Sequence, residues 1–160
     1  MILKFSTKLI TIASAISLAT ACASKSPYFS YNERLIKEKQ PIRLVKDEAY
    51  SQIDSVKYVE DWAGKKGKSV FSEAYSASLF TIIKNNCGYG KGDLIEQRIV
   101  NHSKTEWEEV WIFNDEKSYR TDGTSGLTVF VQYDPKTNRN QTDFFGDCHA
   151  GRGVSFVENY

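Results

Sequence analysis

The sequence contains little histidine, cysteine or proline, and charge of one sign is not in excess. Of its 160 residues, two are histidines, three are cysteines and three are prolines. Two histidines without companions at ligand spacing do not indicate a zinc site. The formal net charge is +1, whereas a nucleic-acid-binding protein usually carries an excess of Lys and Arg to neutralise phosphates. We therefore expect no metal, no cofactor and no nucleic acid to be bound.

A long hydrophobic run is also lacking, although the N-terminus has the three parts of an export signal. Lys4 and Lys8 provide a positive segment, and residues 9–19 (LITIASAISLA) form an apolar stretch of 11 residues. No charged residue occurs at positions 9–24, a span of 16 residues. A membrane-spanning helix needs about 18 or more. The pattern predicts a signal peptide over residues 1–21.

The end of this signal, LATAC at residues 18–22, resembles the lipobox of bacterial lipoproteins. In those proteins a cysteine preceded by small residues is acylated and becomes the first residue of the mature chain. The leucine usual three positions before the cysteine is replaced by Ala19, and Leu18 lies one position further back. The resemblance covers this segment only, and it implies an acylated Cys22 that anchors the protein in a membrane.

The same resemblance implies a location in the cell envelope. Lipoproteins retained at an inner membrane carry Asp directly after the cysteine, whereas Ala23 follows Cys22 here. In a cell with two membranes this implies the outer membrane, with the protein facing the periplasm. The alternative is cleavage at an Ala-x-Ala motif at 19–21 or 21–23, which gives a periplasmic or secreted protein.

The two remaining cysteines, Cys87 and Cys148, predict a disulfide, because an exported protein folds in an oxidising compartment. The bond would close a loop of about 60 residues and stabilise the fold by about 4 kcal/mol through loop-closure entropy. A reactive thiol at Cys148, next to His149, is the alternative. Neighbouring side chains of an extended segment point to opposite sides, so His149 is badly placed to activate that thiol.

The rest of the pattern predicts an α+β domain, in which one amphipathic helix packs on an antiparallel β-meander of about five strands. The helix is expected over residues 69–86, capped by Ser69 or Ser72 and ended at Gly88. Its apolar stripe comprises positions 71, 74 or 75, 78 or 79, and 82. Strands are expected at residues 93–102, 105–113, 126–134, 142–147 and 153–159, with a short one at 117–123.

We expect a lipidated N-terminus and tether over residues 22–41, followed by the globular domain at 42–160. A short helix over 32–39, stopped by Pro41, is expected within the tether. Its aromatic residues suit either a lipid headgroup layer or a position folded back on the domain. These are Tyr28, Phe29 and Tyr31.

The segment between the tether and the main helix has less definite patterns. Residues 42–62 are ambiguous, because Ala49, Ile53 and Val56 keep helical spacing, whereas residues 55–59 (SVKYV) fit a strand. Residues 63–69 (AGKKGKS) predict a solvated loop, because a short charge run usually lies in solvent.

One face of strand 105–113 gathers the candidate interaction surface: Trp107, Glu109, Trp111 and Phe113. Alternation along a strand places these four side chains on the same face. Aromatic residues suit an interface, and Glu109 between two tryptophans suits sugar binding or an acid with a raised pKa. A second carboxylate at catalytic separation cannot be identified, so no catalytic residue is assigned.

Three functions remain open. The first is a lipid-anchored envelope protein whose small non-catalytic domain binds another envelope component, with a protein as the expected partner. The second is a periplasmic or secreted inhibitor or immunity-type protein. An enzyme that acts on cell-wall or sugar substrates ranks last, because no catalytic constellation is found.

Overall fold

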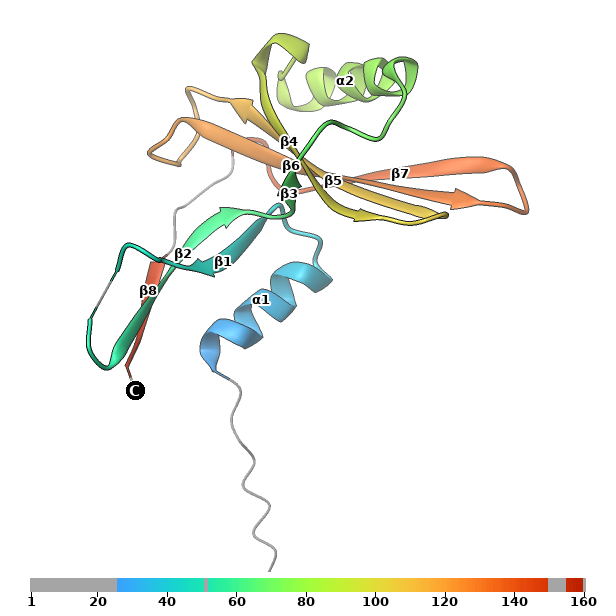
Figure 1. Ribbon diagram of the computed structural model, residues 1–160. Coiled ribbons are helices and arrows are strands. Elements are labelled where there is room, and N and C mark those ends of the chain that lie inside the picture. Colours follow the sequence, from blue (N-terminus) through green and yellow to red (C-terminus); the bar gives the residue numbers. More distant parts are fainter. Residues whose placement is uncertain (1–25, 51, 150–154, 160) are drawn as a thin grey trace, which may run out of the picture.

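The computed structural model describes residues 26–50, 52–149 and 155–159, so the expected signal peptide 1–21 and Cys22 lie outside the described residues. In chain order the elements are α1 (Pro27–Lys37), β1 (Ile42–Lys46), β2 (Ser55–Trp62), β3 (Lys65–Lys66), α2 (Glu73–Cys87), the 3₁₀ helix η1 (Lys91–Asp93), β4 (Leu94–His102), β5 (Glu106–Asn114), β6 (Thr124–Asp134), β7 (Arg139–Phe145) and β8 (Ser155–Asn159). Figure 1 shows two sheets, with α2 over the larger one and α1 beside the smaller one.

The larger sheet is an antiparallel meander in the order β3-β4-β5-β6-β7. Its centre is regular: β5 and β6 pair without a break from Glu106 opposite Gln132 to Asn114 opposite Thr124. Helix α2 packs on this sheet, and Cys87 is joined to Cys148 by a disulfide. The predicted α+β fold, a helix on an antiparallel meander of about five strands with one disulfide, is confirmed.

Two expectations about this sheet are wrong. Residues 117–123 form turns instead of a strand, because Asp115 and Asp122 accept hydrogen bonds from the backbone N–H groups of Lys117 and Thr124. Such local bonds compete with a strand ladder. The expected loop at 63–69 contains the short strand β3, in which Lys65 pairs with Ile99. The side chains of β3 are nevertheless exposed.

The smaller sheet has the order β1-β2-β8 and resolves the ambiguity of residues 42–62 as two antiparallel strands. Val45 lies opposite Val59 in this hairpin. The expected last strand exists over residues 155–159, but it pairs with β2 and not with the meander. Residues 153 and 154 of that expected strand lie outside the described residues.

Helix α1 begins at Pro27, five residues earlier than expected, since proline is tolerated in the first turn of a helix. Its Leu35 is 5% exposed. The side chain of Asn32 donates to the backbone carbonyl of Leu44 and accepts from the backbone N–H of the same residue, both at 2.8 Å. These contacts dock α1 on β1, so residues 27–37 are part of the folded domain instead of a tether.

Helix α2 has the expected ends. The hydroxyl of Ser72 accepts from the backbone N–H of Tyr75, and Gly88 ends the helix with a φ of 84°. Leu79 and Ile83 are its buried residues, whereas Ile82 is 43% exposed. The apolar stripe therefore continues from Leu79 by four positions and not by three.

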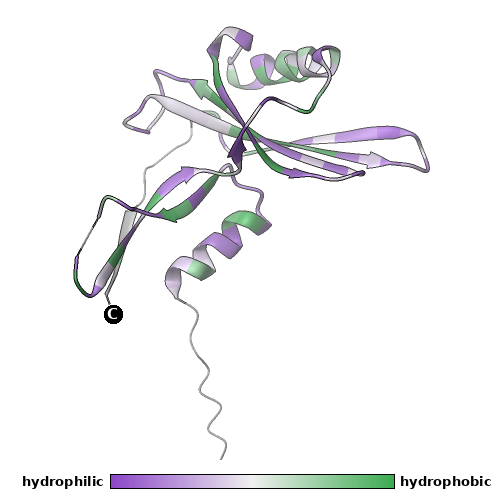
Figure 2. Ribbon diagram, viewed as in Figure 1, coloured by the Kyte–Doolittle hydropathy of each residue, from purple (hydrophilic) through white to green (hydrophobic). Residues whose placement is uncertain are grey.

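The central strand β5 serves two cores, because its side chains alternate between the faces of the sheet. Trp111 and Phe113 pack under α2, while Val110 and Ile112 pack with Trp62 on the opposite face. The β6–β7 hairpin extends past the area below α2, and its free end is mostly hydrophilic (Figure 2). The large sheet thus has one face that packs under α2 and an opposite face that is contacted by Trp62, the last residue of β2.

The contact between Trp62 and Gly126 of β6 generates a first prediction. A Cβ atom at Gly126 would lie 2.8 Å from Cε3 of the Trp62 ring, so alanine cannot fit without moving a buried indole. We expect Gly126→Ala to lower the free energy of unfolding by about 1–3 kcal/mol through overpacking, measured by urea denaturation. Gly92→Ala is the matched control, since no atom lies within 4 Å of its added Cβ. Equal losses in the two variants would contradict the prediction.

Candidate functional site

The four residues expected to form an interaction surface have different environments. Glu109, Trp111 and Phe113 are completely buried, each with an exposed fraction of 0%. The prediction of an exposed surface is wrong for these three, because α2 packs on their face of β5. Trp107 is only partly buried and lines a surface hollow.

This hollow, which we call the aromatic groove, has a volume of about 270 Å³. Its walls come from the segment that enters α2 and from β5, β6 and β7. It is lined by Val70, Phe71, Ser72, Tyr75, Trp107, Val131 and Asn140. The lining therefore has three aromatic rings. Besides the hydroxyl of Tyr75, it has one further hydroxyl, from Ser72, and one amide, from Asn140, and none of its side chains is charged.

The buried carboxylate of Glu109 positions one wall of the aromatic groove. Its Oε1 accepts from the Ser69 hydroxyl at 3.0 Å and from the Val70 N–H at 2.8 Å. Its Oε2 accepts from the indole N–H of Trp111 at 2.7 Å. Ser69 Oγ in turn accepts from the Phe71 N–H at 3.1 Å. Glu109 therefore holds the backbone that carries Phe71, and both of its oxygens have protein donors.

The rings of the groove are held by further contacts. The hydroxyl of Tyr75 forms a hydrogen bond with the hydroxyl of Thr142 on β7. The Phe71 ring meets the Tyr75 ring edge-on at 5.6 Å between centroids. Phe71 also lies 6.4 Å from the ring of Trp111 below. Two of the three rings are thus fixed before any ligand binds.

A second hollow adjoins the groove on the β6–β7 hairpin, and we call it the polar shelf. Its volume is about 780 Å³, and Asn140 borders both hollows. The shelf is lined by Thr105, Gln132, Tyr133, Asp134, Pro135, Thr137, Arg139, Asn140 and Gln141. Its two charged residues, Asp134 and Arg139, are of opposite sign and face each other in register. Amides and hydroxyls make up most of the rest.

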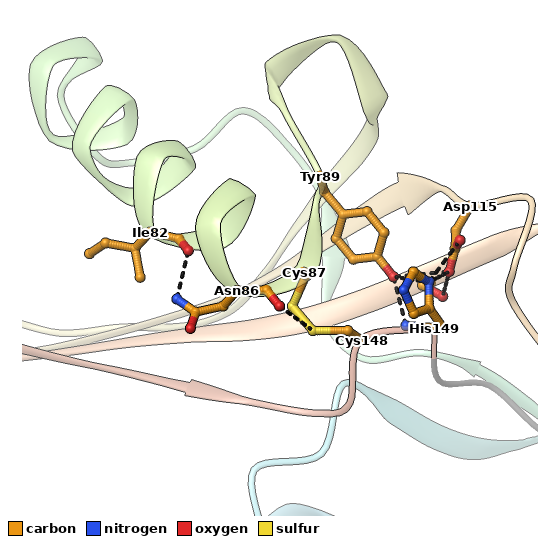
Figure 3. Close-up of a disulfide and its surroundings, with 8 residues drawn as sticks. Ile82, Asn86, Cys87, Tyr89, Asp115, Cys148 and His149 are labelled. Carbon is orange, nitrogen blue, oxygen red and sulfur yellow. Dashed lines mark hydrogen bonds and ion pairs between the residues drawn. A yellow bond between two sulfur atoms is a disulfide. The ribbon is translucent and has the colours of Figure 1, made fainter.

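A different polar cluster surrounds Asp115, next to the disulfide (Figure 3). Asp115 is 6% exposed. Its carboxylate accepts from the Ser125 hydroxyl at 2.6 Å and the Tyr89 hydroxyl at 2.9 Å. Nδ1 of His149 lies 2.9 Å from Asp115 Oδ2. Burial alone would raise the pKa of Asp115, but hydrogen bonds from Ser125, His149, the Lys117 N–H and Tyr89 outweigh it and lower the pKa to about 2.

This cluster fastens the segment that follows β7. The backbone N–H of His149 donates to the Tyr89 hydroxyl at 2.7 Å, and His149 has a φ of 63°. Cys148, one residue earlier, is bonded to Cys87 at the end of α2, with 5.2 Å between the Cα atoms. The predicted disulfide is confirmed, and the alternative of a free Cys148 thiol is wrong because its sulfur is in this bond.

The Asp115–His149 pair resembles half of a catalytic triad, but its surroundings do not complete one. The adjacent cavity of about 300 Å³ is lined by Cys87, Gly88, Tyr89, Asp93, Asn114, Asp115, Glu116, Lys117 and His149. Among these described residues there is no serine, threonine or free cysteine to act as a nucleophile. The hydrogen bonds of Asp115 instead join the end of β5 to the start of β6 and to the segment that follows β7, which is a structural role.

Comparisons with protein families, with curated proteins and with solved structures found no match to this chain. Within residues 26–50, 52–149 and 155–159, no group of three or more His, Cys, Asp or Glu side chains is placed to hold a metal ion. In the same part of the chain, neither α1 nor α2 combines the length and the apolar character needed to cross a membrane. The site is therefore defined by its own geometry.

Part of this site could be predicted from the sequence. The Cys87–Cys148 disulfide and the face of Trp107 were expected. Phe71 and, as an alternative to position 74, Tyr75 were expected in the buried stripe of the helix. The sequence around Asn140 indicated only a polar turn. The Asp115 cluster was also missed, because its members are brought together only by the pairing of β5 with β6 and by the return of the chain after β7.

The depressed pKa of Asp115 predicts the pH dependence of stability. A carboxyl group whose pKa is lower in the folded state stabilises the fold above its unfolded pKa, and this stabilisation is lost as the pH falls through the folded value. We expect the free energy of unfolding to fall between about pH 5 and pH 2, and to fall less steeply in Asp115→Asn. Denaturant unfolding at a series of pH values measures this.

Tyr89→Phe is the matched variant, because it removes one hydrogen bond to Asp115 but keeps the ring that stacks on Phe113 at 4.8 Å. Its slope should lie between those of the unmodified protein and Asp115→Asn. Identical slopes in all three proteins would show that Asp115 does not contribute.

Proposed function

We propose that this chain is a lipid-anchored protein of the bacterial cell envelope, and that its α+β domain is a non-catalytic module that binds another envelope component. The export signal at residues 1–21 and the lipobox-like segment at 18–22 support this location. The Cys87–Cys148 disulfide supports it as well, because such bonds persist in oxidising compartments.

The distance between the proposed anchor and the domain is short. Helix α1 begins at Pro27, so the path from Cys22 spans at most about 18 Å when fully extended. An acylated Cys22 would therefore hold α1 at the lipid headgroups. Phe29 and Ile36 are 47% and 57% exposed and lie two turns apart on this helix. Arg34 and Lys37 occupy its last turn, and basic residues are attracted to anionic lipids.

Two neighbouring aromatic residues of α1 have different environments. Tyr28 stacks on Tyr58 of β2 with 4.0 Å between ring centroids. Tyr28 is thus folded back on the domain, as one of the two alternatives expected. Phe29, on the neighbouring position, has the larger exposure and suits the headgroup layer.

The aromatic groove lies on the other side of the molecule, and this placement is the observation that carries the proposal. Helix α1 docks on the smaller sheet, and Trp62 at the end of β2 packs on the face of β5 opposite α2. The groove is lined by the start of α2 and by residues of β5, β6 and β7. Figure 1 shows α2 and α1 on different sides of the large sheet. A protein anchored through Cys22 would therefore present the groove away from its own membrane.

The anchor is tested by the intact mass of the protein extracted from membranes and alkylated without reductant. We expect a chain that begins at an acylated Cys22, with Cys87 and Cys148 unalkylated. Cys22→Ala should lose the acyl mass and leave the membrane fraction. An unacylated soluble chain from the unmodified gene would overturn the proposal and favour the secreted inhibitor class.

The orientation is tested by a photo-crosslinking residue, p-benzoylphenylalanine, placed at position 29 of the membrane-bound protein. We expect crosslinks to lipid from position 29 because the anchor holds α1 at the headgroups. The matched control is position 70, where Val70 is 41% exposed on the groove side. Lipid crosslinks of equal yield from both positions would contradict this orientation.

A further inference from the structure

We propose that the free edge of β7 pairs with β7 of a second copy of this chain, as antiparallel strands of a symmetric dimer. The inference goes beyond the proposed function, because it concerns how the domain assembles and not what it binds. It depends on the direction of the backbone groups of β7, on the absence of cover along this strand in the described structure and on the charges that the strand carries.

The edge strands of the two sheets differ in how they are protected. An exposed edge strand offers unpaired N–H and C=O groups to other chains, and proteins usually cover it, shorten it or charge it. At the edge strand β1, the side chain of Asn32 occupies both the N–H and the C=O of Leu44. The edge strand β3 comprises only Lys65 and Lys66, and both are exposed.

Strand β7 has none of these protections. It is seven residues long, contains neither lysine nor proline, and pairs with β6 without a shift in register. Within the described part of the chain, no strand pairs with its outer side. A long, regular edge of this kind is a site at which another strand can be added.

The backbone groups that point outward from β7 follow from the register of the sheet. In an antiparallel sheet, successive residues of a strand direct their N–H and C=O groups to alternate sides. Tyr133 of β6 donates its N–H to the carbonyl of Thr105, directly before β5, at 2.8 Å. Its neighbour Gln132 therefore points to β7, where it lies opposite Gln141. The residues of β7 whose backbone groups point away from β6 are Asn140, Thr142 and Phe144.

The charges of β7 select the register of a symmetric pair. Alternation places Arg139, Gln141 and Asp143 on one face of the strand. A pair centred on Gln141 puts Arg139 of each copy opposite Asp143 of the other, and directly opposed opposite charges stabilise a sheet. A pair centred on Asp143 would oppose two like charges. A pair centred on Thr142 would oppose Arg139 to the ring of Phe145, so the register centred on Gln141 is the one that we infer.

Both charged groups are available for this contact. Arg139 is exposed and Asp143 is half-buried, and among the described residues neither forms an ion pair. The carboxylate of Asp143 accepts from the amide of Gln141 at 3.1 Å. Arg139 and Asp143 are four positions apart on an extended strand, which is about 13 Å, so they do not meet within one chain.

The edge is accessible to a second copy. The β6–β7 hairpin extends past the area below α2 (Figure 1). In the inferred register, Asn140 of each copy lies opposite Thr142 of the other, and each such pair exchanges its backbone hydrogen bonds. This ladder is short, so we expect a weak dimer whose population depends on concentration.

The symmetry of the pair is compatible with anchorage in one membrane. Directly opposed residues of antiparallel strands point to the same face of a sheet, so both copies of α2 would lie on one face. Figure 1 shows α1 on the other side of the large sheet, so both copies of α1 would lie there. Two chains acylated at Cys22 would thus reach the same membrane, and confinement there raises their effective concentration. This step rests on the proposed function, whereas the strand pairing does not.

The test measures the mass of the full chain, extracted in excess detergent, by sedimentation equilibrium at a series of protein concentrations with the detergent matched in density. We expect the protein mass to rise from one chain to two. Arg139→Asp and Asp143→Arg should each weaken the dimer by about tenfold, because like charges then face each other at two symmetric positions. The double variant exchanges the two charges and should recover the affinity to within about threefold.

Lys104→Asp is the matched control for charge. It makes the same change in net charge at an exposed residue between β4 and β5, away from β7, and should dimerise as the unmodified protein does. Urea unfolding of each variant shows that it is folded.

A second pair of variants tests the backbone at one exposed position of β7. Asn140→Pro removes an N–H that points away from β6, so it should weaken the dimer while the β6–β7 ladder persists. Asn140→Ala keeps this N–H and should retain the dimer.

Three results would overturn the inference. The first is a single chain at every concentration, which would leave the edge of β7 to an extended segment of a different protein. The second is a dimer that Arg139→Asp, Asp143→Arg and Asn140→Pro all leave unchanged, which would place the interface elsewhere. The third is a double variant as weak as the single ones, which would show that the two charges do not face each other. None of these results depends on acylation of Cys22, whereas the intact mass tests the anchor alone.

Discussion

The completely buried carboxylate of Glu109 fixes the segment that precedes α2 on the large sheet. A charge without water must be met by donors, and leaving such a group unpaired costs several kcal/mol. The donors come from Ser69, Val70 and Trp111. If the segment before α2 left the sheet, Glu109 would lose the two donors that this segment provides. The position where α2 starts, and with it the wall of the aromatic groove, follows from this requirement.

The two faces of the large sheet belong to two separate hydrophobic clusters. On one side Trp111 packs under α2, and on the other Val110 packs with Trp62 and the smaller sheet. The disulfide and the Asp115 cluster close the end of the sheet remote from the β6–β7 turn. The groove and the shelf lie toward the other end of the sheet, at the β6–β7 hairpin.

The sequence was sufficient for local features and insufficient for those that depend on distant pairing. The caps at Ser72 and Gly88 could be predicted because they act within one turn of helix. Alternation could show that Glu109 and Trp111 share a face, but it could not show that α2 covers that face. The pairing of β8 with β2 had no local signal, since the partners are about 100 residues apart in the chain.

That last pairing has a consequence for biogenesis. The smaller sheet includes β8, so it cannot be complete until residues 155–159 have been synthesised. Until then, β2 has an open edge that can pair with other chains. Contacts of such long sequence separation also form slowly. Until β8 is added, the smaller sheet would therefore consist of β1 and β2 alone, with one edge of β2 unpaired.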